Sequence, residues 1–99
     1  MKINWTPESI NTFEQIIENI YKYWTQKEVI IFIKQAEKTI EQIRTNPYMF
    51  VTSNKKMQVR KGFVNSLISI FYKVDIQNNK IDILTFWNNR QNPNKNPFN

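Results

Sequence analysis

The sequence predicts an α+β domain, with an N-terminal strand and an antiparallel two-helix hairpin packed on one face of an antiparallel sheet. Three observations support this fold class. Apolar residues recur with the 3.6-residue period of helices in the first half of the chain. In the second half they recur with the two-residue period of strands. A short join between the two helical stretches makes them antiparallel neighbours, so the expected element order is β-α-α-β-β-β.

The first strand and the first helix are predicted from the opening residues. Ile3 and Trp5 alternate with polar residues, which is the pattern of a short strand. Thr6 fits the N-cap of a helix, and Pro7 fits the first helical position, where the missing N–H is not needed. The helix then carries one apolar stripe, made of Ile10, Phe13, Ile16, Ile17, Ile20, Tyr21 and Trp24.

A capping box starts the second helix. Thr25 can accept from an amide of the first turn, while the Glu28 carboxylate reaches back to the amide of Thr25. The helix ends at Asn46, because the residue before Pro47 is displaced from the helical conformation. Its apolar stripe consists of Val29, Phe32, Ile33, Ala36, Ile40 and Ile43.

Three strands are expected after the helices. A weak strand covers residues 57–64, a central strand covers 68–76 and a last strand covers 81–87. Asn78 and Asn79 tolerate positive φ, which suits a two-residue hairpin turn between the last two strands. This register puts Asp75 opposite Asp82, an unfavourable pair that a bulge would relieve. On the core face it pairs Ile76 with Ile81, Val74 with Ile83 and Tyr72 with Thr85.

The opposite face of this sheet carries apolar side chains that a single helical layer would leave uncovered. Phe71, Leu84 and Phe86 fall on that face in the predicted register. An exposed apolar cluster usually marks a contact surface. In the alternative arrangement the C-terminal tail folds back over the cluster. We expect one domain over residues 1–93 and a flexible tail at 94–99.

Composition excludes several kinds of chemistry. The chain has no Cys and no His, which rules out disulfides, thiolate zinc sites and a Ser-His-Asp triad. We therefore expect neither a cofactor nor a metal. No apolar stretch has the length of a membrane span or of a signal peptide, so we expect a cytoplasmic protein without a membrane partner. Abundant Asn, Ile and Lys suggest an A/T-rich bacterial genome.

Positive charge is confined to the second half of the chain. Lys, Arg and acidic residues balance over residues 1–54, so the formal net charge of +6 arises from residues 55–99. This bias favours a polyanionic or acidic partner, although solubility alone is the simpler interpretation. The basic residues of that half are Lys55, Lys56, Arg60, Lys61, Lys73, Lys80, Arg90 and Lys95, against Asp75 and Asp82.

Five short motifs in the expected order are similar to those of a bacterial toxin family. They are Trp5-Thr6-Pro7 at the strand-to-helix step, Ile43 to Pro47 at the end of the second helix, Ile70 to Asp75 in the central strand, Ile81 to Leu84 in the last strand, and Asn89 to Pro93 after it. In this order they resemble the RelE/ParE superfamily over residues 3–93. The resemblance implies the toxin of a type II toxin–antitoxin pair, held inactive by a cognate antitoxin that wraps it. Phe71, Leu84 and Phe86 are the antitoxin contacts that we expect.

The resemblance leaves the cellular target open. RelE-like members cleave ribosome-bound mRNA without a metal, using basic side chains around the scissile phosphate. The Arg that they carry on the central strand is Ser69 here, whereas Arg90 matches the Arg that follows the last strand. Tyr72 matches the family's tyrosine but is expected to point into the core. The nuclease set is therefore incomplete, and its candidate catalytic residues are Arg60, Lys61 and Arg90, with Lys55 and Lys56 beside them.

Two further functions do not need a catalytic set. A ParE-like toxin binds an essential target such as DNA gyrase, and this is the function that the incomplete nuclease set favours. A plain nucleic-acid-binding module is the third possibility, and its affinity would fall steeply with salt. In either case the expected contacts with a target or nucleic acid are Lys55, Lys56, Arg60, Lys61, Lys73 and Arg90.

Overall fold

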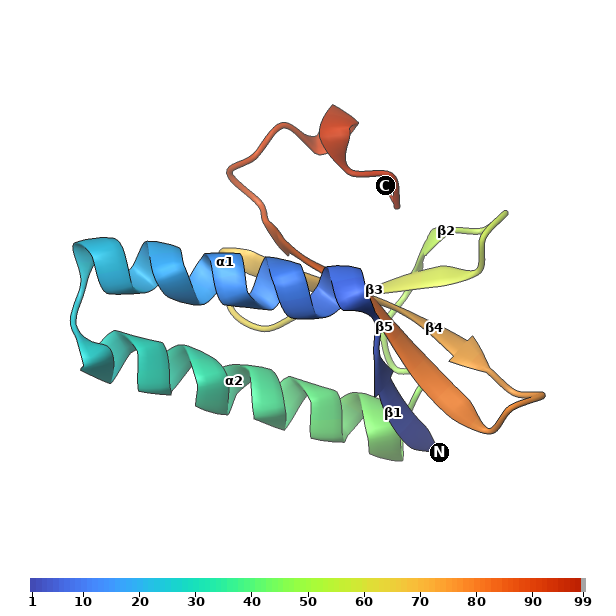
Figure 1. Ribbon diagram of the computed structural model, residues 1–99. Coiled ribbons are helices and arrows are strands. Elements are labelled where there is room, and N and C mark those ends of the chain that lie inside the picture. Colours follow the sequence, from blue (N-terminus) through green and yellow to red (C-terminus); the bar gives the residue numbers. More distant parts are fainter. Residues whose placement is uncertain (99) are drawn as a thin grey trace.

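Two helices pack side by side on a five-stranded sheet in the computed structural model, which describes residues 1–98 (Figure 1). The strand order is β1-β5-β4-β3-β2. None of the helices within the described part of the chain is long and apolar enough to cross a membrane. The elements are β1 Lys2–Trp5, α1 Pro7–Tyr23, α2 Gln26–Thr45, β2 Thr52–Asn54, β3 Val59–Phe63, β4 Ile68–Asp75, β5 Lys80–Asn88 and the short 3₁₀ helix η1 Pro93–Lys95.

The α+β class, the helical hairpin and the order of the predicted elements are confirmed. The sheet is not wholly antiparallel, because β1 runs parallel to β5, with Ile3 opposite Ile81. A short additional strand, β2, pairs with β3. The strands predicted as an antiparallel sheet, β3, β4 and β5, pair antiparallel. The direction of β1 was not predicted, because β1 and β5 lie at opposite ends of the sequence, where no hairpin turn sets their relative direction.

The core lies between the helices and the sheet. Its centre is a group of aromatic rings, in which the ring of Phe13 lies about 5 Å from those of Trp5, Phe32 and Phe86. Most of the predicted helical stripes face this core. The end of the α1 stripe does not, because Trp24 sits at the C-cap beyond the sheet and is 67% exposed.

The hairpin between β4 and β5 has a longer turn than predicted. Residues 76–79 form the turn, with Asn79 at a φ of 50°. Val74 therefore pairs with Ile81, and Tyr72 with Ile83, each two residues away from the predicted partner. Ile76 lies in the turn and is exposed instead of facing Ile81. The prediction of a two-residue turn was wrong. Because the pairing of β4 with β5 shifts by two residues, every side chain of β4 stays on its predicted face.

A β-bulge at Leu84 changes the face on which the end of β5 lies. Phe71 pairs with Thr85 and Tyr72 pairs with Ile83, so Leu84 is the extra residue of β5. After the bulge the alternation is reversed, and Phe86 points into the helix-side core, where it is 2% exposed. The expectation that Phe86 is exposed on the opposite face was therefore wrong.

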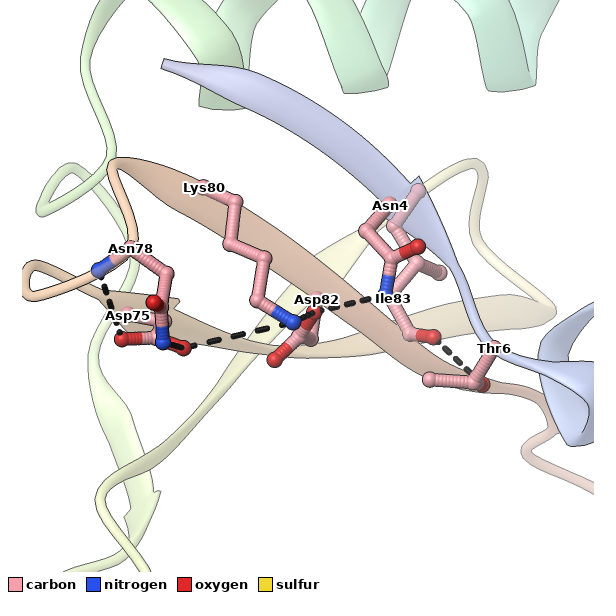
Figure 2. A network of polar contacts seen from close by, with 7 residues as sticks. All are labelled: Asn4, Thr6, Asp75, Asn78, Lys80, Asp82 and Ile83. Carbon is pink, nitrogen blue, oxygen red and sulfur yellow. Dashed lines mark hydrogen bonds and ion pairs between the residues drawn. The ribbon is translucent and has the colours of Figure 1, made fainter.

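A polar network replaces the predicted clash between two aspartates (Figure 2). Lys80 lies opposite Asp75, and its Nζ is 3.1 Å from Asp82 Oδ1 and 4.0 Å from Asp75 Oδ2. Asn4 on β1 donates to Asp82 Oδ1 at 2.8 Å. The Asn78 side chain donates to Asp75, which holds the pKa of that carboxyl below its ordinary value. The network links β1 to the β4–β5 hairpin.

Thr6 joins three elements at the point where β1 ends. Its Oγ1 donates to the Ile83 carbonyl at 2.7 Å (Figure 2). The Thr6 amide donates to the same carbonyl at 3.2 Å, and Oγ1 also lies 3.2 Å from the Leu84 carbonyl. The same Oγ1 accepts from the Ser9 amide at 3.2 Å, which makes Thr6 the predicted N-cap of α1. Further along β5, the Phe86 amide donates to Thr12 Oγ1 at 3.0 Å. The start of α1 is thus tied to the edge of β5.

We expect Thr6→Val to lower the free energy of unfolding by about 1–2 kcal/mol, because it removes a helix cap and leaves carbonyl oxygens of β5 without their hydroxyl donor. Urea denaturation measures this change. Thr45→Val is the matched control, since the Thr45 hydroxyl bonds only to carbonyls of its own helix. Equal losses in the two variants would contradict the role of Thr6.

Candidate functional site

The predicted basic residues do not converge on one site. Arg60 and Lys61 are neighbours on β3, so their side chains leave opposite faces of the sheet. Arg60 pairs with Tyr72 on the helix side, donates to the Phe50 carbonyl at 2.7 Å and lies 4.9 Å from the ring centre of Tyr48. Lys61 pairs with Phe71 on the other face. The two cations cannot clamp the same phosphate in this arrangement.

The other four predicted basic residues lie in separate, exposed positions. Lys55 and Lys56 occupy the turn between β2 and β3. Lys73 is on β4, opposite Asp82, and Arg90 follows the end of β5. These positions suit a broad basic contact surface better than a compact catalytic centre.

Ser69 and Tyr72 are both buried and are held by hydrogen bonds. Ser69 Oγ donates to Asn89 Oδ1 at 2.9 Å, and the Tyr72 hydroxyl donates to the Pro47 carbonyl at 2.7 Å. Burial raises the pKa of Tyr72 to about 12. The expected placement of Tyr72 in the core is confirmed, and neither side chain is available to a substrate in this structure.

The C-terminal segment covers the sheet face opposite the helices. It ends close to β2 (Figure 1). The Phe98 ring lies 6.1 Å from that of Phe71, and Ser53 Oγ on β2 donates to the Phe98 carbonyl at 3.0 Å. Phe71 is fully buried as a result, so its expected exposure was wrong and the alternative of a folded-back tail is confirmed. We call Lys61, Phe71 and the segment over them the covered sheet face. Asn99, the end of the predicted flexible tail, lies outside the described residues.

The covering segment contains a buried polar atom that has no hydrogen-bond partner among the described residues. Asn96 is 4% exposed, and its Oδ1 accepts from the Phe98 amide at 2.9 Å. Its Nδ2 is buried and has no hydrogen-bond partner among the described residues. A buried donor without a partner costs about 1–3 kcal/mol, which weakens the hold of this segment on the sheet.

A cavity of about 480 Å³ lies between α1, the loop before β4 and the end of β5. Buried apolar side chains form its floor, and within residues 1–98 Arg90 is the only charged residue that lines it. Sequence reasoning selected Arg90 but missed the cavity, because its walls come from segments far apart in the chain. The aromatic residues in its walls are Tyr23, Trp24 and Trp87.

One solved structure is similar to this fold over nearly its whole length. It is described as a chromosomal ParDE TA system from P. aeruginosa, and it matches with a TM-score of 0.68 at 14% identity. The match covers 89% of this chain and 95% of that chain. The chain therefore shares the fold of that structure. No protein-family model matches the sequence. No curated protein matches it either.

The fold accounts for two of the sequence motifs. Thr6 of the Trp5-Thr6-Pro7 step caps α1 and bonds to β5. Asn46, before Pro47, forms the C-cap of α2. Both motifs therefore serve the architecture of this fold, and their presence does not distinguish a nuclease from a binding protein.

The raised pKa of Tyr72 predicts how stability changes in alkaline solution. Below about pH 10 the phenol is neutral in the folded and unfolded chains alike. Between pH 10 and 12 it ionises in the unfolded chain first, so the folded state loses about 2–3 kcal/mol of stability from this group. Tyr72→Phe has no ionisable group at this position, so its free energy of unfolding does not include this loss. The free energy of unfolding of the native protein should therefore fall relative to that of the variant between pH 10 and 12. Denaturation at each pH measures it, and a constant difference would contradict the assignment.

Proposed function

We propose that this protein is the toxin of a type II toxin–antitoxin pair, which arrests growth by binding an essential target and is neutralised by a cognate antitoxin. The observation that carries this proposal is the likeness of fold, over nearly the whole of both chains, to a structure described as a ParDE TA system. The target that we propose is the one bound by ParE-like toxins, DNA gyrase.

Binding is favoured over RNA cleavage by the arrangement of the polar side chains. Arg60 is engaged with the loop after α2, and Lys61 lies on the opposite face of β3. Ser69 replaces the family's phosphate-binding Arg, and Tyr72 is buried with a raised pKa. A RelE-like ribonuclease, which would use Arg60, Lys61 and Arg90, therefore needs a rearrangement that a binding toxin does not need.

The exposed basic residues are the target contacts in this proposal. Lys55 and Lys56 project from the β2–β3 turn, and Lys73 and Arg90 are exposed elsewhere on the second half of the chain. Arg60 and Lys61 are half-buried and contribute through the parts that remain accessible. An acidic surface on the target complements this distribution of charge.

The antitoxin has two kinds of anchor available. Leu84 is partly accessible at the bulge, and Phe71 becomes accessible when the segment that carries Asn96 and Phe98 moves away. Phe86 is held in the core and is not an anchor while the protein is folded. Ile30 and Ile31 on α2 are exposed and extend the apolar surface that an amphipathic antitoxin segment could cover.

The decisive experiment is induced expression in a bacterial host, alone and together with the protein of the adjacent small gene. We expect growth arrest that the neighbour relieves, with transcripts intact and a DNA-damage response. Primer extension checks the transcripts, and cuts that need ribosomes would replace the proposed mode with RelE-like cleavage. Normal growth at good expression would overturn the toxin assignment.

A charge-reversal pair tests the proposed target surface. Lys55→Glu with Lys56→Glu should weaken the arrest strongly, because it reverses the charge of the β2–β3 turn. Lys22→Glu with Lys27→Glu is the matched control, since it changes the net charge equally on exposed residues of the helical hairpin. Both variants should keep the far-ultraviolet circular dichroism of the native protein. Equal toxicity of the two pairs would contradict the assignment of the turn.

A further inference from the structure

The cavity beside α1 has the form of a ligand pocket. Its floor includes Phe32, Ile68 and Phe86, all of which are buried in the core. Trp24 and Trp87 are among its lining residues, and Trp24 is largely exposed. Its volume of about 480 Å³ is in the range of pockets that bind small organic ligands. The residues of the covered sheet face do not line it.

Several polar groups at this pocket have no partner within residues 1–98. The Arg90 guanidinium forms neither an ion pair nor a hydrogen bond there, and its backbone amide alone is bonded, to Asn88 Oδ1. The side-chain amides of Gln15, Asn19 and Gln91 are likewise free of hydrogen bonds in that part of the chain. Among the described residues, no Asp, Glu or Lys lines the pocket. The site therefore offers one positive charge and three amides, each with a donor and an acceptor.

This combination matches the chemistry of a nucleotide. Asn and Gln side chains pair with the donor and acceptor atoms on the edge of a base, and adenine is the base that they read with two hydrogen bonds. Exposed indole rings provide surfaces on which bases stack. Arg binds phosphate through its planar set of donors. An apolar peptide side chain would satisfy the floor alone and leave the amides desolvated without partners.

We propose that this pocket binds a purine 5′-nucleotide, with the base stacked on an indole of Trp24 or Trp87 and the phosphate at Arg90. The nucleotide is either free in solution or the exposed 5′ end of a strand, since both present the same base, sugar and phosphate. This site shares Arg90 with the proposed target surface, but its binding of a nucleotide does not depend on the proposed toxin function.

Titration of the purified full chain with AMP, followed by tryptophan fluorescence and calorimetry, tests the proposal. We expect saturable binding, weakened about tenfold or more in Arg90→Ala because a charge-assisted phosphate contact is lost. Arg44→Ala is the charge-matched control, since Arg44 is exposed on α2 and does not line the pocket. It should bind AMP like the native protein. Absence of saturation at millimolar AMP, or equal affinities of the two variants, would overturn the proposal.

A second pair of variants tests the stacking surface. Trp24→Ala should weaken AMP binding about tenfold, which is the scale of one lost base–aromatic stack. The exposed position of Trp24 allows this change without loss of the core. Tyr21→Ala removes a comparably exposed aromatic ring of α1 outside the pocket, and it should leave the affinity unchanged. If Trp24→Ala and Trp87→Ala both bind AMP with the affinity of the native protein, neither indole stacks on the base and that part of the proposal is contradicted.

Related probes separate the parts of the ligand and its source. Adenosine and ribose 5-phosphate should each bind more weakly than AMP, and ribose 5-phosphate as tight as AMP would exclude a base site. A 5′-phosphorylated oligoadenylate distinguishes the two sources: tighter, AMP-competed binding assigns the pocket to a strand end, and binding no tighter than AMP assigns it to the free nucleotide. Because binding is measured on the purified chain, its failure is distinguishable from a failure of growth arrest.

Discussion

The open edge of β5 is the constraint on which the arrangement of the helices depends. β1 pairs with β5 only as far as Ile83, and beyond that point the backbone groups of β5 need other partners. Side chains at the start of α1 provide them, because Thr6 donates to the Ile83 carbonyl and Thr12 accepts from the Phe86 amide. The helix is thereby fixed against the strand, and α2 follows through the short join at Thr25.

The bulge at Leu84 lies at this same junction and connects the backbone to the core. Thr6 Oγ1 reaches the carbonyl of Leu84, the extra residue, and that of Ile83 just before it. The extra residue turns Phe86 toward the helices, where it meets Phe13 and closes the floor of the pocket. One displaced residue in a strand thus decides both the packing of the aromatic core and the shape of the cavity.

Features set by neighbouring residues could be predicted from the sequence, and features set by distant ones could not. The Glu28 carboxylate accepts from the Thr25 amide as the capping box requires, and Asn46 caps the end of α2. The direction of β1, the bulge and the turn before Lys80 depend on pairings between separate strands, which a single sequence does not reveal. The pocket could not be predicted from the sequence for the same reason, because its walls come from segments far apart in the chain. That Arg60 and Lys61 point apart follows from strand alternation alone and was open to sequence reasoning.

The hydrogen bond between Thr6 and Ile83 joins residues 77 positions apart in the sequence, and this separation has a consequence for folding during translation. The helical hairpin can form as soon as Thr45 has left the exit tunnel, but the strand that covers its aromatic face is still being translated. Until β5 emerges, Trp5 and Phe13 have no sheet to pack against. The nascent chain therefore exposes an apolar helix face until β5 emerges, and any protein that shields that face would act before the fold is complete.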